Sequence, residues 1–112
     1  MNIFSYSHIG GIMDNRQFNL EDDKVLKLVT DFKALGDVGR LKIVLLLMDG
    51  KKSVGEISKI TGFSQSATSH QLRILKDARI LISEKHGNVN FYEISDEHVK
   101  TIIIKSVEHL DC

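Results

Sequence analysis

The chain has 112 residues, 42% hydrophobic and 27% charged, which fits one globular domain with a single core and excludes a two-domain enzyme. Fifteen basic and fifteen acidic residues cancel to a formal net charge of zero, which by itself argues against a nucleic-acid binder. No apolar run approaches the roughly 20 residues that span a bilayer, and the first residues lack a secretion signal. We therefore expect a cytoplasmic protein with no membrane partner. A single cysteine, Cys112, excludes a disulfide within the chain.

The first half of the chain shows the periodicity of helices. Residues 1–19 have no sustained apolar period, and we interpret them as an N-terminal arm. Residues 23–35 and 41–48 carry apolar side chains at helical spacing, and a glycine follows each run closely. A third helix of about two turns should begin after Ser53, because Ser53 stands three residues before Glu56 in a capping box pattern.

The second half predicts a helix, a hairpin and a last helix. Ser64 is a suitable N-cap for a helix that continues to Ala78. Residues 80–94 then form two strand-like segments around a turn that contains glycine, and Ser95 is positioned to cap a last helix over residues 96–110. The fold class is therefore mainly α with a small β-hairpin. Two helices joined by a tight turn and followed by a hairpin make a winged helix-turn-helix, which we assign to residues 20–112.

The charges are distributed unevenly along the chain. Residues 51–85 contain seven basic and three acidic side chains, a net charge of +4, whereas residues 86–112 contain two lysines and five acids, a net charge of −3. A basic middle suits a polyanion, and an acidic end suits a cation.

The fourth predicted helix has an outward face of small hydroxyls and basic groups, and its opposite face is expected to pack through Ala67, Thr68, Leu72, Ile74, Leu75 and Ala78. Small hydroxyls let a helix approach base edges closely, and basic side chains reach phosphates or guanine. The turn of the hairpin could lie along a minor groove. We therefore expect double-stranded DNA as a partner, with the contacts made by Ser64, Gln65, Ser66, Ser69, His70, Arg73, Lys76, Lys85 and Asn88.

Each of these features also has an ordinary structural explanation. A polar helix face is by default a solvated surface, and the zero net charge leaves open a winged-helix module that binds protein instead of DNA. Gln71 interrupts the apolar face of the same helix, and we interpret it as a buried amide that a neighbouring helix satisfies.

Four side chains of the last helix are of types that bind zinc or a similar divalent metal, namely Asp96, His98, His109 and Cys112. The two histidines are eleven residues apart, so they share a helix face to within about 20° but stand roughly 16 Å apart. An antiparallel copy of the helix in a two-fold dimer would bring Asp96 and His98 of one chain to His109 and Cys112 of the other. The packing surface between the two copies would be supplied by the apolar Val99, Ile102, Ile103, Ile104 and Val107. Taken singly, each side chain is more simply a dipole-stabilising acid, a surface histidine or an idle thiol.

The chain resembles the ArsR/SmtB family of bacterial winged-helix metal sensors from about Asp23 to the end. The resemblance rests on the segments FKALGDVGRLKIVLLL and VGEISKITGFSQSATSHQLRILKDARIL and on the pattern of the last helix. The family's site between subunits uses an Asp, a His two residues later, a second His, and a His or Glu three residues further on. Cys112 departs from this pattern, and its softer thiolate would favour cadmium while remaining compatible with zinc.

The resemblance implies a homodimeric, metal-responsive repressor, with the first and last helices at the dimer interface, that releases its operator when it binds Zn(II) or, alternatively, Cd(II), Co(II) or Ni(II). A DNA-binding regulator that senses no metal, and a redox switch through Cys112, remain as alternatives. The chain has no nucleophile elbow and no phosphate-binding glycine loop, so we do not expect an enzyme.

Overall fold

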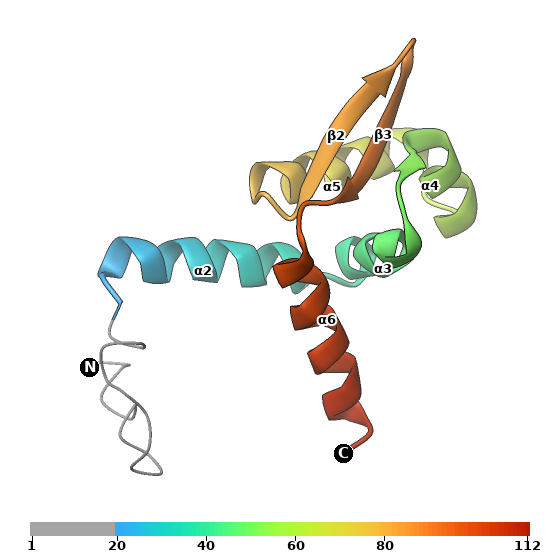
Figure 1. Ribbon diagram of the computed structural model, residues 1–112. Helices are drawn as coiled ribbons and strands as arrows, with labels where there is room; N and C mark the ends of the chain where they lie inside the picture. Colours follow the sequence, from blue (N-terminus) through green and yellow to red (C-terminus); the bar gives the residue numbers. More distant parts are fainter. Residues whose placement is uncertain (1–19) are drawn as a thin grey trace. The chain divides into compact units, whose positions relative to one another are not determined.

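A computed structural model describes residues 20–112, which divide into two compact units between Thr30 and Asp31. The described part of the first unit is the N-terminal part of one helix, and the second unit contains all the remaining elements (Figure 1). The expected N-terminal arm, residues 1–19, lies outside the described residues.

The elements follow the predicted order, with two additions, a 3-10 turn and a short strand. In chain order they are α2 (Asp22–Leu35), α3 (Val38–Leu46), a 3-10 turn (Leu47–Asp49), β1 (Lys52–Ser53), α4 (Val54–Thr61), α5 (Gln65–Asp77), β2 (Leu81–His86), β3 (Val89–Ile94) and α6 (Glu97–Leu110). The short strand β1 pairs with β3, so that the hairpin becomes a three-stranded antiparallel sheet in the order β1-β3-β2. A two-residue strand is too short to show alternation in the sequence, and we did not predict it.

The helix caps agree with the sequence except at α6. The hydroxyl of Ser53 accepts the Glu56 N–H, and the Glu56 carboxylate accepts the Ser53 N–H, which completes the predicted capping box. The cap of α6 is Asp96, whose Oδ1 accepts the N–H of Val99 at 3.1 Å, and the prediction of Ser95 was wrong. The backbone N–H of Ser95 donates instead to the Ile80 carbonyl, so this residue belongs to the base of the hairpin.

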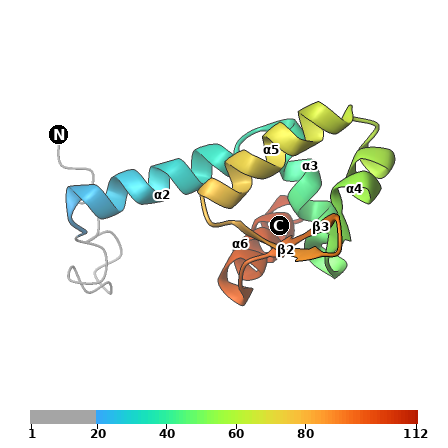
Figure 2. The ribbon, with the colours of Figure 1, turned by 90° about the horizontal axis from the view of Figure 1, so that it is seen from above.

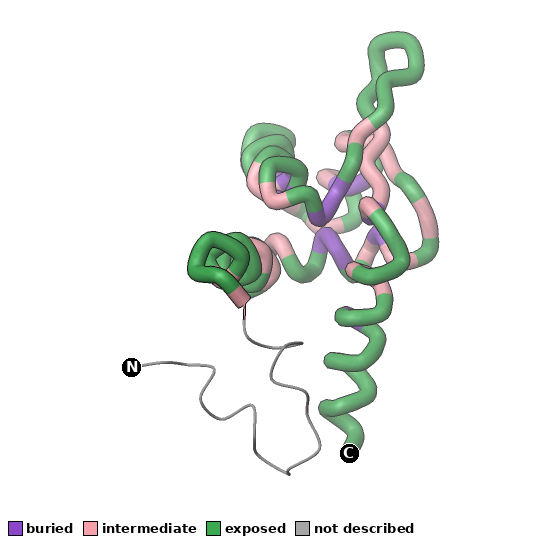
Figure 3. Tube along the Cα trace, turned by 60° about the vertical axis from the view of Figure 1, so that its left-hand side comes forward, coloured by how far each residue is buried: buried purple, intermediate pink, exposed green. Residues whose placement is uncertain are grey.

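One apolar core holds α3, α4, α5 and the sheet together. Figure 2 shows the three helices as a packed group beside the strands, and Figure 3 places the buried segments where helices and strands converge. The fully or almost fully buried apolar residues are Ala34, Ile43, Val44, Leu47, Ile57, Leu72, Leu75, Ile80, Leu81, Ile94 and Ile103. No helix within residues 20–112 is long and apolar enough to cross a membrane.

Two isoleucines of α4 provide a matched test of this core. Ile57 has no exposed surface, whereas Ile60, one turn further, is 58% exposed. We expect Ile57→Ala to lower the free energy of unfolding by about 2 to 5 kcal/mol because it leaves a cavity. Ile60→Ala should change it by less than about 1 kcal/mol. Urea unfolding at one protein concentration measures both, and equal losses would contradict the placement of the core.

Candidate DNA interface and metal-ligand pairs

The turn between α4 and α5 is held by side-chain hydrogen bonds. Gly62 ends α4 with a φ of 79°, a left-handed conformation that glycine adopts without strain. The Ser58 hydroxyl donates to the Phe63 carbonyl at 2.7 Å, and the Phe63 N–H donates to the Thr61 hydroxyl at 3.3 Å. Ser64 then caps α5 by accepting the N–H of Ala67 at 3.1 Å. These bonds fix the direction in which α5 leaves the turn.

The predicted outward face of α5 is exposed. The exposed residues of this helix and its cap include all the predicted contacts there, namely Ser64, Gln65, Ser66, Ser69, His70, Arg73 and Lys76. On the opposite side Thr68, Leu72 and Leu75 are buried, as expected. Ala67, which was expected on the packed side, is exposed instead, because the buried side of α5 begins only at Thr68.

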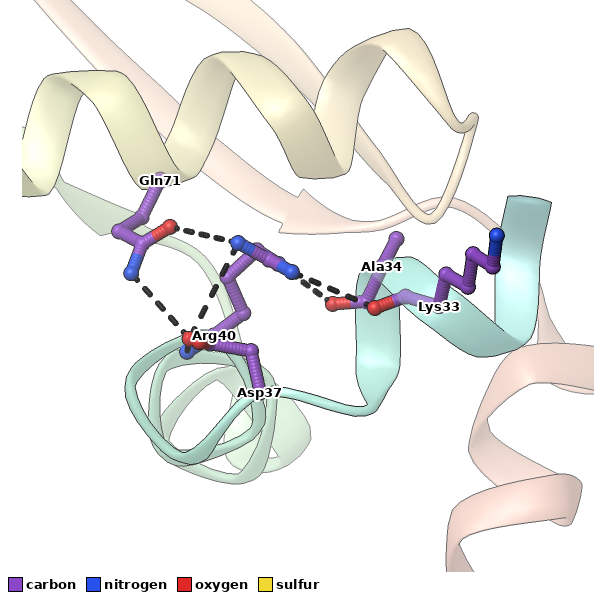
Figure 4. Close-up of polar contacts among 5 residues, drawn as sticks. All are labelled: Lys33, Ala34, Asp37, Arg40 and Gln71. Atoms are coloured by element: carbon purple, nitrogen blue, oxygen red, sulfur yellow. Dashed lines mark hydrogen bonds and ion pairs between the residues drawn. The ribbon is translucent and has the colours of Figure 1, made fainter.

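Gln71 is half-buried on the inner side of α5, and its amide is satisfied by α3 and its N-cap (Figure 4). Its Oε1 accepts from Arg40 Nη1 at 3.1 Å, and its Nε2 donates to Asp37 Oδ2 at 3.3 Å. The interpretation of Gln71 as an amide bonded to a neighbouring helix is therefore confirmed. The backbone N–H of Arg40 and then its charge hold the pKa of Asp37 below the usual value, and burial opposes them.

The wing has a two-residue tip at Gly87–Asn88, and Gly87 has a φ of 64° as a type II′ turn requires at its first position. Lys85 and Asn88 are exposed there, as their predicted role demands. Lys51, the residue before β1, is an additional exposed cation beside this sheet, and its Nζ lies 6.0 Å from the centre of the Phe91 ring. Its place depends on β1, so reasoning from the sequence did not assign it to the wing.

The first candidate ligand pair is formed where α6 begins. His98 Nδ1 lies 3.6 Å from Asp96 Oδ1, and the histidine side chain is 94% exposed. The capping bond to Val99 also uses Oδ1 of Asp96. The two side chains that were expected to act together therefore do lie together and face solvent.

The second candidate pair lies at the other end of α6. Cys112 lies two residues beyond the end of α6 at Leu110, and its N–H donates to the His109 carbonyl at 3.3 Å, so the backbone keeps it next to the last turn of the helix. Both side chains are exposed, and the cysteine is a free thiol. Within residues 20–112 of one chain no three His, Cys, Asp or Glu side chains gather into a metal site.

The apolar face of α6 is divided between the core and the solvent. Ile103 is buried in the core of its own chain, and Val99 is half-buried against that core. The exposed apolar side chains are Ile102, Ile104, Val107 and Leu110. The surface predicted to pack against a second copy, Val99 to Val107, therefore loses Ile103 to the core of its own chain. It gains the exposed Leu110 beyond its predicted end. Figure 1 shows α6 running from the base of the hairpin with its C-terminal end away from α3, α4 and α5.

Comparison with known proteins places this arrangement in a family. Residues 37–83 match the model of bacterial regulatory proteins of the arsR family. The chain is 38% identical over 79 residues to a homolog of the cadmium resistance transcriptional regulatory protein CadC from Staphylococcus aureus, which covers 70% of this chain and 65% of the relative. It is 31% identical over 88 residues to a homolog of the transcriptional repressor SmtB from Synechocystis sp., covering 79% and 67%. The chain spans about two thirds of the length of these curated relatives.

A solved structure agrees with the family match. The homodimeric winged helix-turn-helix DNA-binding domain of Mb0332 from Mycobacterium bovis superposes with a TM-score of 0.74 at 26% identity, over 82% of this chain and 88% of that one. The family match, the relatives and the fold together define a DNA-binding winged-helix transcriptional regulator, not an enzyme. The chain belongs to the ArsR family of bacterial regulatory proteins. The predictions of family, fold class and class of function are confirmed.

Two lysines in the two differently charged halves allow a test of the DNA interface. If Lys76 contacts a phosphate, Lys76→Ala should weaken binding to all duplexes alike and lower the slope of log affinity against log salt by about 1. Lys105→Ala on α6, where the lysine pairs with Glu108 at 3.4 Å, should leave that slope unchanged. Fluorescence anisotropy at several salt concentrations measures both, and equal slopes for the two variants would contradict the assignment of Lys76.

Proposed function

We propose that the protein is a homodimeric repressor that releases its operator when Zn(II), or a similar divalent metal, binds between the subunits. The observation that carries the proposal is the placement of two exposed donor pairs at opposite ends of α6. The relatives support it, because one is named for cadmium resistance and another as a transcriptional repressor.

The dimer is supported by apolar surface on two helices. On α6 the exposed Ile102, Ile104 and Val107 have no cover within the described part of their own chain. The helix α2 likewise exposes Leu28 and Phe32. Burying such side chains against a second copy removes apolar area from water and stabilises the dimer by about 25 cal/mol for each Å². The structural relative from Mycobacterium bovis is described as homodimeric.

The donor set fits the metals that were expected. One carboxylate, two imidazoles and one thiolate supply the four ligands of a closed tetrahedral site. On an ideal helix His98 and His109 lie roughly 120 to 140° around the axis from the buried Ile103, so both face away from the core of their own chain. The thiolate of Cys112 favours the softer ions, so Cd(II) should bind at least as tightly as Zn(II), whereas Co(II) and Ni(II) should bind less well. A bound ion would act as a crosslink between the subunits, because four protein ligands leave no open position for catalysis.

The helix α6, which carries the proposed metal ligands, is connected directly to the end of α5, the proposed DNA-recognition helix. The N–H of Ser95, one residue before Asp96, donates to the carbonyl of Ile80 at 2.9 Å, and Ile80 follows the turn that ends α5. Ile103 of α6 belongs to the same core as Leu75 of α5. A shift of α6 imposed by a bridging ion would therefore move α5, and a coupling of about 1 to 3 kcal/mol is usual for such linkage. A two-fold dimer reads two half-sites of the DNA. A small change in the angle between the subunits therefore moves both recognition helices out of register with the DNA grooves.

Substitution of either histidine of α6 should abolish both the metal site and the response. We expect His98→Ala and His109→Ala to weaken Zn(II) binding by more than about 100-fold, since each removes a ligand from both sites of the dimer. Both variants should bind DNA as tightly as the wild-type protein, and Zn(II) should not release them. Metal titration, and anisotropy of a duplex enriched by the wild-type protein from a random pool, measure the two effects.

The wing histidine supplies the control for this experiment. His86 lies 3.3 Å from Glu84 and 5.4 Å from the Phe91 ring, outside both donor pairs, and His86→Ala should keep two metal ions per dimer. Undiminished metal binding by both α6 variants would contradict the site and favour a regulator without metal sensing. A response that survives in both variants but is lost in Cys112→Ser would favour the redox alternative.

A further inference from the structure

A polar network of three side chains lies on the inner side of α5, away from the exposed residues proposed to contact DNA. It consists of Arg40, Asp37 and Gln71, and we call it the Arg40–Asp37–Gln71 network (Figure 4). Its bonds join three elements: the last turn of α2, the beginning of α3 and the middle of α5. None of these three residues is among the proposed DNA contacts or the proposed metal ligands.

Arg40 binds the end of α2 and the recognition helix with the same side chain. Its Nε donates to the Ala34 carbonyl at 2.7 Å, and its Nη2 donates to the Lys33 carbonyl at 3.3 Å. These are carbonyls of the last helical turn, which have no i+4 partner within α2, and the Lys33 carbonyl also accepts the Gly36 N–H at 3.2 Å. Its Nη1 donates to Gln71 at 3.1 Å, and the side chain is only 18% exposed. A planar guanidinium with three such bonds holds the elements at fixed distances.

Asp37 binds the other end of the same amide. Its Oδ2 accepts the backbone N–H of Arg40 at 3.0 Å, which caps α3, and also accepts Gln71 Nε2 at 3.3 Å. Both ends of the Gln71 amide are therefore bonded, one to a cation and one to an anion. An amide bonded at both ends cannot flip without losing both bonds, so the rotation of α5 about its axis is fixed at this point.

A glycine brings α3 close to this amide. A Cβ atom added at Gly39 would lie 3.1 Å from Gln71 Nε2 and 3.4 Å from Asp37 Oδ2. Such a contact is tight enough that the amide would have to shift by a few tenths of an ångström. The absence of a side chain at Gly39 therefore allows the network to close.

We propose that Gln71 is a positioning residue for DNA recognition, which sets the rotation of α5 through Arg40 and Asp37 without touching DNA. Its neighbours along the helix, His70 and Ser69 on one side and Arg73 on the other, are exposed contacts of the proposed interface. One residue corresponds to about 100° of rotation, so a small turn of α5 redirects all of these side chains together. The proposal rests on the reading of DNA by α5 and is independent of the metal.

The test compares specific with unspecific binding in a buffer that contains a metal chelator. The probes are a duplex that the wild-type protein enriches from a random-sequence pool and an unrelated duplex of equal length. Gln71→Leu should bind the enriched duplex about tenfold more weakly. Its binding to the unrelated duplex and its salt dependence should be unchanged, because no phosphate contact is lost. The control is Ile74→Val on the same helix, which loosens packing and keeps the network, and its ratio of specific to unspecific affinity should equal that of the wild-type protein.

A second pair of variants removes no hydrogen-bonding group from the protein. Gly39→Ala should lower the affinity for the enriched duplex several-fold, whereas Gly55→Ala, whose added Cβ would meet nothing closer than 3.9 Å, should leave it unchanged. Should Gln71→Leu not fold, this pair decides the question. Wild-type affinity of Gln71→Leu and Gly39→Ala for the enriched duplex, or an equal loss on both duplexes, would overturn the positioning role alone. A wild-type protein that enriches no duplex would overturn DNA reading itself and the positioning role with it.

Discussion

The rise of the α-helix is the constraint on which the function depends. Eleven residues separate His98 from His109, and a helix places them on one face but roughly 16 Å apart, which is too far for a shared ion. Each histidine has its own companion donor at its own end, Asp96 or Cys112. The geometry of a single chain therefore leaves two donor pairs, and in the proposed dimer a second copy in antiparallel orientation would complete two four-ligand sites. Metal binding and dimer geometry would then become one equilibrium, as the proposed sensor requires.

Movement at α6 must reach α5 if the metal is to affect DNA. The structure shows a direct connection at one end of the recognition helix, where the Ser95 N–H binds the Ile80 carbonyl. The Arg40–Asp37–Gln71 network holds the middle of the same helix from the other side. A helix held at its middle and displaced at its end turns as a rigid body, because its own hydrogen bonds and its packed face resist bending. Two arrangements of α5, one that fits the grooves and one that does not, are then sufficient for a switch.

Much of the fold follows from local signals in the sequence. The capping box at Ser53 and Glu56 and the cap at Ser64 depend only on residues within one helical turn, and the structure confirms them. Burial of Thr68, Leu72 and Leu75 follows from helical periodicity. The sequence also predicts that Gln71 forms hydrogen bonds inside the protein, since an amide on an apolar face needs partners. It does not predict that the partners are Arg40 and Asp37, because they lie more than 30 residues away and no local pattern identifies them.

The predictions from the sequence were wrong or incomplete where tertiary contacts select one of several local structures that the sequence allows equally. Ser95 and Asp96 are both good N-caps, and the bond from Ser95 to Ile80 decides in favour of Asp96. The strand β1 has only two residues and exists because β3 offers a free edge, and Lys51 lies near Phe91 for the same reason. The donor pair at each end of α6 is predictable from the spacing of its residues. The approach of the two pairs to each other depends on how two copies of the chain pack in the dimer.

Mixed dimers test most directly whether the donor pairs of the two subunits combine into shared metal sites. One chain carries His98→Ala and the other His109→Ala, each with a different purification peptide free of histidine, and doubly selected dimers are titrated with Zn(II). Across the subunits, one site then loses both histidines and the other keeps all four ligands. The account predicts one ion per mixed dimer at wild-type affinity, and no tight binding by either parent homodimer. Mixed dimers that bind no better than their parents would contradict it.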